Sequence, residues 1–246
     1  MIRRFVGLST AAVLVAQGML MLGAQGAHAQ ALQPLTCLLV PARTSDIGSD
    51  RVGIVRFVDV RRADFVEQNE PLVRIDAEIA EADLRVARIS IVSLEERLGR
   101  SEGLLSRNLI SQDEIGALRT DLQLALANEA RAQMELERAT IRAPFAGYVS
   151  DIGVSVGELI GSDPLLRLIE VSTLRAELVY LAGAFGQISV GDTLTVRVDL
   201  ADAEVAAVVT AIDPFIDATS NAFTVLAEIE NDDLALPAGT SCAVVN

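Results

Sequence analysis

Lysine is absent from this chain, and its 20 basic residues are all arginine. Tryptophan is absent too, and the only histidine is His28. Because a catalytic triad uses an imidazole as its base, this lack argues against a hydrolase of that class. Two cysteines, Cys37 and Cys242, are too few for a cysteine-based transition-metal centre. Aromatic residues make up only 4% of the chain, so its core must be built from Ala, Val, Leu and Ile.

The charge balance is strongly acidic, with 34 Asp and Glu residues and a net charge of −14. Such a charge disfavours binding to phosphate groups, nucleic acids or anionic membranes. Acidic pairs such as Asp232-Asp233 are expected to be solvated charges rather than general acids and bases. We therefore expect a protein that is not an enzyme, that needs no cofactor and that has no nucleic-acid partner.

The N-terminus has the features of an export signal over residues 1–29. Arg3 and Arg4 precede a long apolar stretch, and the small-x-small sequence Ala27-His28-Ala29 is a typical cleavage site. Cleavage there leaves 18 Arg against 34 acids, a net charge of −16, and no histidine. The alternative is a segment kept as a membrane anchor. In either case the body of the protein is expected outside the cytoplasm.

The two cysteines lie near the two ends of the expected mature chain. In an exported protein such a pair favours a disulfide between Cys37 and Cys242. The bond would close a loop of about 200 residues, which stabilises a fold by about 4–5 kcal/mol in the chain-entropy model. The alternative is a pair of buried free thiols.

Two segments of equal length, residues 53–76 and 147–170, repeat one pattern. Each begins Gly-x-Val, has a second valine seven residues after the glycine, and ends on Pro-Leu, an apolar residue and arginine. Alternating apolar residues between Gly, Asn and Asp turns indicate short strands. A single hairpin cannot bury its apolar face. We therefore predict that the two copies face each other as a β-sandwich and that the chain between them projects out of this sandwich.

The chain between the copies has a helical pattern that turns back near residues 107 and 108. Its seam positions recur at alternating steps of four and three, as in a coiled coil. They are Ala80, Leu84, Ala87, Ile91, Leu94, Leu98, Ser101 and Leu105 on the first arm, and Ile115, Leu118, Leu122, Ala125, Glu129, Ala132, Leu136 and Ala139 on the second. We predict two antiparallel helices of similar length, the second starting at the capping box Ser-Gln-Asp-Glu of residues 111–114.

Five strand-like runs separated by Gly, Asp and Asn turns follow residue 170. They are TLRAELVYL, DTLTVRVDL, AEVAAVVTAIDPF, AFTVLAEIEN and TSCAVVN. With no helical pattern among them, closure into a small β-barrel is expected. A strand at residues 34–43 is expected to join this barrel and to bring Cys37 near Cys242.

This layout resembles the membrane fusion proteins, or periplasmic adaptor subunits, of Gram-negative efflux and secretion systems. The segments that carry the resemblance are ATIRAPFAGYVSDIGVSVGELI (139–160), TLRAELVYL (173–181), VGDTLTVRVD (190–199), AIDPFIDATSNAFTVLAEIEN (211–231) and LPAGT (236–240). The family implies a mixed α and β fold, in which a lipoyl-like β-sandwich is split by a long antiparallel α-helical (coiled-coil) hairpin and followed by a small β-barrel. The expected parts are a signal peptide (1–29), an N-terminal strand joining the barrel (30–50), lipoyl-like half 1 (51–76), the α-helical hairpin (77–139), lipoyl-like half 2 (140–170) and the β-barrel domain (171–246).

The resemblance also implies a contact site at the hairpin tip. Adaptors that dock onto an outer-membrane channel carry Arg, then Leu four residues later, then Ser seven after that, which corresponds to Arg100, Leu104 and Ser111. The Leu would offer an apolar knob, the Arg a fork of donors and the Ser a compact polar contact. The spacing alone is equally consistent with Leu104 closing the seam and Ser111 only capping the second helix.

An adaptor of this family would link an inner-membrane transporter to an outer-membrane channel, as a hexameric ring in the periplasm that is associated with the inner membrane. A pump of the resistance-nodulation-division class is the first expectation and an ATP-binding-cassette exporter the second. The chain stops at Asn246, so the membrane-proximal domain of longer members is expected to be missing. The hairpin is also short for the family, which would change the reach of the assembly.

Two other protein classes share parts of this pattern. A lipoyl or biotin carrier uses the same sandwich but needs a lysine, which this chain lacks. A periplasmic scaffold whose hairpin binds another partner is the main alternative outside transport.

Overall fold

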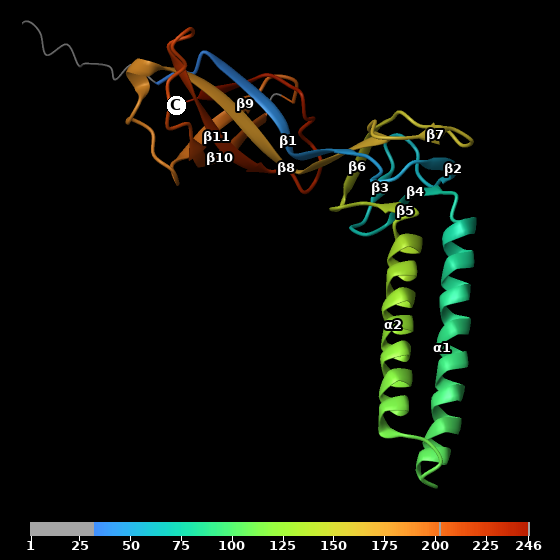
Figure 1. Cartoon of the computed structure of the whole chain (residues 1–246). Helices are drawn as coiled ribbons and strands as arrows, with labels where there is room; N and C mark the ends of the chain where they lie inside the picture. The colour runs from blue at the N-terminus through green and yellow to red at the C-terminus, as the bar shows by residue number, and fades with distance from the viewer. Residues whose placement is uncertain (1–31, 202, 246) are drawn as a thin grey trace, which may run out of the picture. The chain divides into compact units, whose positions relative to one another are not determined.

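The structure is a computed structural model that describes residues 32–201 and 203–245. The predicted signal peptide at 1–29 lies outside these residues. The described chain folds into two long helices and twelve strands, which confirms the mixed α and β class (Figure 1). The helices are α1 (Glu78–Leu105) and α2 (Gln112–Glu137). The strands are β1 (Thr36–Ile47), β2 (Gly53–Val58), β3 (Phe65–Val66), β4 (Pro71–Ile75), β5 (Thr140–Arg142), β6 (Gly147–Ile152), β7 (Leu159–Ile160), β8 (Leu166–Leu181), β9 (Thr193–Val198), β10 (Ala203–Ile212), β11 (Ala222–Glu230) and β12 (Cys242–Val245), and a 3₁₀-helix, η1 (Ala182–Ala184), follows β8.

The strands form two sheets that share no ladder. The larger has the order β12-β9-β10-β11-β8-β6-β3, with β1 also paired to β8, and the smaller has the order β5-β4-β2-β7. Strand β8 connects the two regions of the larger sheet, because its first half pairs with β6 and its second half with β11. The predicted boundary between residues 170 and 171 therefore falls inside one continuous strand.

The two copies of the duplicated segment share one hydrophobic core. Val55 and Val73 of the first copy and Val149 and Leu168 of the second are fully buried in the same cluster. Burial of one such aliphatic side chain contributes about 1.5–3 kcal/mol. The two copies therefore fold against each other, as the sequence predicts.

Equivalent turns in the two copies are closed by the same hydrogen bonds. In the first, the Arg61 N–H donates to the Asp64 carboxylate at 2.8 Å, and in the second the Ser155 N–H donates to the Glu158 carboxylate at 2.9 Å. The third residue of each turn has a positive φ. That residue is Gly157 in the second copy, with φ of 88°, but Ala63 in the first, with φ of 71°.

Replacing Ala63 by glycine is expected to stabilise the protein by about 0.5–1 kcal/mol, because the left-handed region is costly for a residue with a Cβ atom and open to glycine. Urea unfolding would measure the change. Ala117→Gly, on the exposed face of α2, is the matched control and should destabilise the protein by about 1 kcal/mol. A loss of stability in Ala63→Gly would contradict the strain at this turn.

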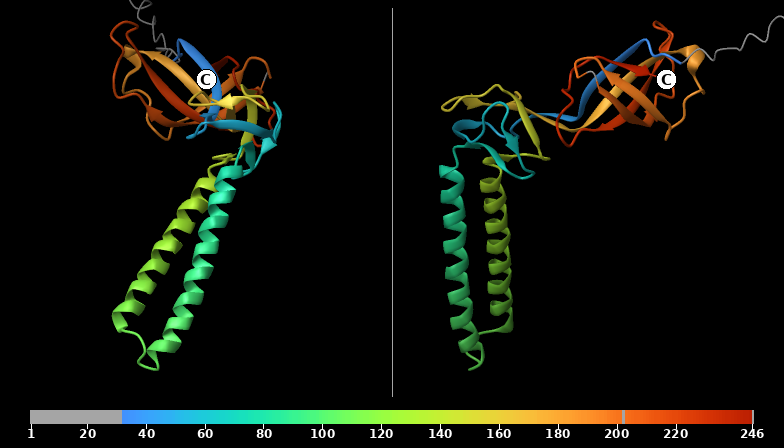
Figure 2. Two further views of the ribbon diagram at one scale, coloured as in Figure 1. Left: turned by 45° about the vertical axis from the view of Figure 1, so that its right-hand side comes forward. Right: turned by 180° about the vertical axis from the view of Figure 1, so that it is seen from behind.

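The second core lies inside six strands that follow one another as β1, β8, β11, β10, β9 and β12. Alternate side chains point inward, as Leu174, Ala176 and Leu178 of β8 do, and these three are fully buried. The two outer members meet again, because the Leu39 N–H donates to the Thr240 carbonyl at 2.9 Å. The strands therefore curl into a barrel-like sheet (Figure 2). Each of the five strand-like runs predicted for this region contains a strand, although several of the runs extend beyond its ends.

Helices α1 and α2 lie side by side and run antiparallel (Figures 1 and 2). All sixteen predicted seam positions are buried or half-buried, whereas Val86, Ile89 and Val92 between them are exposed. The one acidic seam residue, Glu129, accepts a hydrogen bond from Arg88 Nε of α1 at 3.0 Å. Neither described helix combines the length and the apolar character that a bilayer crossing requires.

Candidate partner-binding site at the helical tip

The turn between the two helices is closed by a Schellman motif. The Leu109 N–H donates to the Leu104 carbonyl at 3.1 Å, and the Asn108 N–H donates to the Leu105 carbonyl at 2.9 Å. Asn108 takes the left-handed conformation that this motif requires, with φ of 58°. The turn therefore satisfies carbonyl groups that the end of α1 leaves free, and it holds Leu109 beside Leu104.

Leu104 and Leu109 form an exposed apolar pair on this turn. Their exposed fractions are 40% and 65%, so neither side chain closes the helical seam. An apolar contact between these two positions accompanies many Schellman motifs. Leu104 is predicted from the sequence as a tip residue, whereas Leu109 is not. The signal that would have found it is an asparagine followed by leucine directly after a helix, at the usual positions of this motif.

Arg100 is exposed on α1, one helical turn before Leu104. Its guanidinium has one ion-pair partner among the described residues, Glu96 of the same helix, at 3.4 Å. An exposed pair at this spacing contributes about 0.3–0.5 kcal/mol. Because a guanidinium has five N–H donors in a planar fork, most of its hydrogen-bonding capacity remains open to a partner.

Ser111 is the N-cap of α2. Its hydroxyl oxygen accepts a hydrogen bond from the Glu114 N–H at 3.1 Å, which is one half of the predicted capping box. The hydroxyl hydrogen stays available as a donor. The capping role is thus present, and it does not prevent a polar contact with another molecule.

Two ion pairs across the helices fix their register. Near the tip, Arg119 of α2 donates to Glu102 of α1 at 2.9 Å, and nearer the base Arg88 of α1 donates to Glu129 of α2 at 3.0 Å. Buried Ile115 and Leu118 of α2 lie in the helical seam at the tip end. The tip residues are therefore presented on a paired support rather than on a single helix.

The base of the helix pair is held by a carboxylate. Asp76 accepts hydrogen bonds from the Glu78 N–H at 3.0 Å and from Arg56 Nε at 3.1 Å. The N–H donor of Glu78, and then the Arg56 side chain, lower the pKa of Asp76 below its ordinary value. This carboxylate satisfies a free N–H group at the start of α1, where negative charge is favourable.

No group of three or more potential metal ligands exists among the described residues. An open hollow of about 560 Å³ lies beside the base of the helices and is lined by Arg56, Phe57 and Arg74. Arg56 is paired with Asp76, and Arg74 donates twice to Asp59. The charges of Arg56 and Arg74 are therefore already paired, and Arg142, which also lines the hollow, donates to the Asn69 carbonyl at 2.9 Å.

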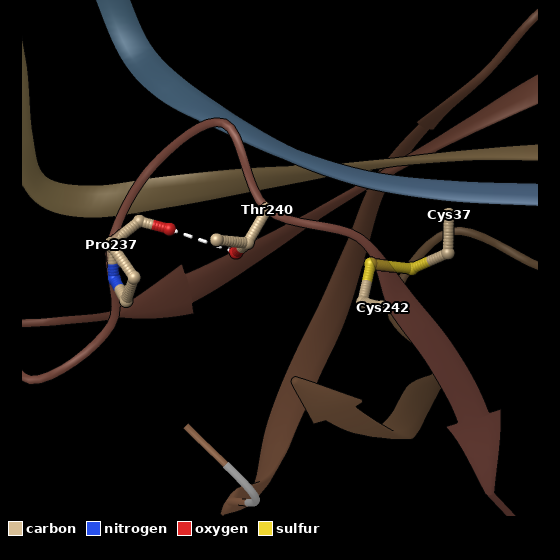
Figure 3. Close-up of a disulfide and its surroundings, with 4 residues drawn as sticks. All are labelled: Cys37, Pro237, Thr240 and Cys242. Atoms are coloured by element: carbon tan, nitrogen blue, oxygen red, sulfur yellow. Dashed lines mark hydrogen bonds between the residues drawn. A yellow bond between two sulfur atoms is a disulfide. The ribbon is translucent and has the colours of Figure 1, made fainter. Parts of the chain in front are cut away.

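Cys37 of β1 and Cys242 of β12 are joined in a disulfide (Figure 3). Their Cα atoms lie 4.9 Å apart across a sequence separation of 205 residues. Nearby, the Thr240 hydroxyl donates to the Pro237 carbonyl at 2.9 Å, which orders the turn before β12. Of the two alternatives that the sequence left open, the structure has the disulfide.

The described chain has the fold of several solved proteins. It superposes on a MacA–MexA chimera that carries the α-hairpin domain of Pseudomonas aeruginosa MexA, with a TM-score of 0.76 and 19% identity, over 85% of this chain and 78% of the chimera. It superposes on the membrane fusion protein Spr0693 of Streptococcus pneumoniae with a TM-score of 0.75 and 14% identity, over 86% of this chain and 97% of that one. This is the fold of the membrane fusion proteins.

The same membrane fusion protein fold is found in a putative efflux transporter from Bacteroides eggerthii, with a TM-score of 0.64 and 15% identity, over 85% of this chain and 67% of that one. In sequence, the chain is 24% identical over 225 residues to an uncharacterised protein of Haemophilus influenzae. That match includes 85% of this chain but 59% of the relative, so the chain spans about three fifths of its length. No family model matches the chain.

Within the membrane fusion protein fold, Arg100, Leu104 and Ser111 all lie at the free end of the helix pair, close to the turn between α1 and α2. All three are exposed, so none of them belongs to the core. Their contact with a channel stays a prediction, as does the division of the chain into the six parts given above.

Proposed function

We propose that this protein is a periplasmic adaptor of a tripartite transport system, which links an inner-membrane pump to an outer-membrane channel through the tip of its helices. The observation that carries the proposal is the helix pair itself. It is inserted between two β halves that share one core, and it ends in a tip whose apolar residues Leu104 and Leu109 are exposed. A helix pair that only stabilised the fold would have the turn between its helices buried against the rest of the protein.

At the tip, Leu104 would insert between two helices of the channel, as side chains of one helix pack into the groove of another. Arg100 would donate to carboxylates or carbonyl groups beside that groove, and the Ser111 hydroxyl would add a short polar contact. Leu109, which the Schellman turn holds beside Leu104, enlarges the apolar contact. The helix pair is proposed to act as an antiparallel coiled-coil hairpin.

The remaining partners follow from the adaptor role. The transporter is proposed to be a resistance-nodulation-division pump, with an ATP-binding-cassette exporter as the alternative, and the adjacent transporter gene would distinguish them. Several copies, six in the proposed ring, would form a sealed conduit in the periplasm, associated with the inner membrane. The protein would couple the pump to the channel and seal the conduit without catalysing a reaction. This role is consistent with its lack of lysine and, after signal cleavage, of histidine.

Charge reversal at the tip tests the proposal. In Arg100→Asp the channel is expected to bind at least about tenfold more weakly, a loss of about 1.4 kcal/mol or more, because donors to the channel become a repelling carboxylate. The measurement is co-purification of the channel and the pump from envelope extracts, followed by titration of the purified channel. The pump should still co-purify, because its contact lies elsewhere.

Arg131→Asp is the matched control, since Arg131 is exposed on α2, far in sequence from the turn, and makes no ion pair among the described residues. It should bind the channel like the unmodified protein. Full retention of the channel by Arg100→Asp would show the tip assignment to be wrong. Failure to recover either a channel or a pump with the unmodified protein would favour the periplasmic scaffold instead.

A further inference from the structure

The seam between the first and last strands of the barrel-like sheet is its weakest ladder. Strand β1 pairs with β8 over nearly its whole length, and β8 pairs with β11 over nine residues. In contrast, β1 meets the end of the chain through a single bridge, Leu38 to Ser241. Two backbone hydrogen bonds supplement it, from Leu39 N–H to Thr240 at 2.9 Å and from Gly239 N–H to Leu39 at 2.7 Å.

The disulfide lies directly on this seam. Cys37 precedes Leu38 by one residue and Cys242 follows Ser241 by one, so the two cysteines are the next opposed pair of the same antiparallel register. Figure 3 shows the bond crossing from β1 to β12 just beyond the turn that carries Thr240. The covalent bond therefore takes the place of the hydrogen-bonded ladder that the other strand pairs have.

Strand β12 has little else to hold it. It pairs with β9 over four residues, from Cys242 opposite Val198 to Val245 opposite Thr195. Only two of its side chains, Cys242 and Val244, are buried. Short elements with few buried side chains are the ones that open locally while the rest of a fold stays closed.

We propose that the Cys37–Cys242 disulfide is a redox-sensitive latch, which keeps β12 on the seam when oxidised and releases it when reduced. The released state has two unpaired edges, on β9 and on the first part of β1, while β8, β10 and β11 remain paired. Such edges are sites for pairing with another strand. The latch is independent of the adaptor role proposed above.

The reductant would be a dithiol. One of its thiolates attacks a sulfur of the Cys37–Cys242 bond, forms a mixed disulfide and releases the other cysteine as a thiolate. The second thiol of the reductant then displaces the remaining cysteine and leaves as an internal disulfide. Two electrons and two protons pass from the dithiol to the two cysteines. Because each cysteine is only 8% exposed, attack requires opening of the seam.

Hydrogen exchange on the purified mature protein, oxidised or treated with dithiothreitol, tests the latch. Alkylation of both thiols under native conditions, read by mass, confirms that reduction is complete. Amides of β12 and of Leu39 are expected to exchange at least about tenfold faster after reduction, and their acceleration should exceed that of the amides of α1, α2 and β11. The double variant Cys37→Ser/Cys242→Ser should match the reduced protein and should not respond to dithiothreitol.

Three results would overturn the latch. Unchanged hydrogen exchange in β12 after complete reduction would mean that pairing with β9 keeps β12 in the sheet without the disulfide. Loss of protection throughout the chain means that the bond maintains the whole fold rather than one strand. Thiols that stay unreactive until the protein is denatured mean that the seam does not open.

Discussion

Gly147→Ala is expected to be the most damaging small substitution in this protein, with a loss of about 3 kcal/mol in the free energy of unfolding and about 6–12 °C in Tm. A Cβ atom at this position would lie 2.4 Å from the carbonyl oxygen of Ile169 and 3.1 Å from its carbonyl carbon. Both are backbone atoms of β8, the strand that joins the two regions of the larger sheet. They cannot move without disturbing the ladder between β6 and β8.

The duplication supplies the matched control. Gly53 begins the first copy as Gly147 begins the second, but a Cβ atom there would first meet the end of the Ile75 side chain, at 3.2 Å. That side chain can turn aside, so Gly53→Ala is expected to cost less than about 1 kcal/mol. Thermal and urea unfolding of both variants measure the difference. Equal losses would show that the close approach of β6 and β8 is not a constraint.

Asn231→Ala is expected to destabilise the protein by about 3 kcal/mol, because it removes the one buried polar side chain of the described residues. The Asn231 side-chain amide donates to the Val171 carbonyl at 2.8 Å and to the Leu236 carbonyl at 3.0 Å. Its oxygen accepts from the Leu236 N–H at 2.9 Å. Alanine leaves these three backbone groups without a partner and leaves a small cavity between β8 and the loop after β11.

Two further variants separate lost hydrogen bonds from lost volume. Asn231→Asp keeps the shape but turns two donors into acceptors that face carbonyl groups. Burial and the facing carbonyl groups would raise the pKa of this carboxyl in the folded state. Its deficit should therefore be largest at high pH, shrink as the pH falls, and be smallest below about pH 4, where the carboxyl is protonated in both states and one donor is restored. Asn128→Ala on the exposed face of α2 should change stability by less than about 0.5 kcal/mol. If Asn231→Ala matched Asn128→Ala, the network around Asn231 would have no energetic role.

Strands β1 and β8 run from one core to the other, and the contacts between them there are not indicated by any local sequence pattern. The β1–β8 ladder shifts register between Pro41 and Arg43. Pro41 is paired with Leu174, whereas Arg43 is paired with Glu170, so β8 has more residues within the shift than β1 has. Arg43 pairs with Glu170 and lies over the ring of Phe145, with 4.7 Å from Cζ to the ring centroid. These residues are far apart in the chain, so the sequence pattern predicts only separate short strands here.

The helices were the most predictable part. Their seam positions follow from a periodicity of 3.5 residues, and all of them are buried or half-buried, including Glu129. At the tip, Arg100, Leu104 and Ser111 were predicted from spacing and resemblance, and their contact with a channel stays a prediction. Leu109 was missed, because its exposure depends on the left-handed conformation of Asn108 rather than on the helical repeat.

The sequence by itself determined the elements of this protein, because helical and strand periodicities, turn residues and caps act within a few positions along the chain. It also determined what chemistry is missing, since lysine is absent and histidine is confined to residue 28. Only the tertiary structure decided which strands pair. That pairing makes β8 one continuous strand and places Cys37 opposite Cys242, because register arises from the burial of side chains distant in sequence and not from local preference.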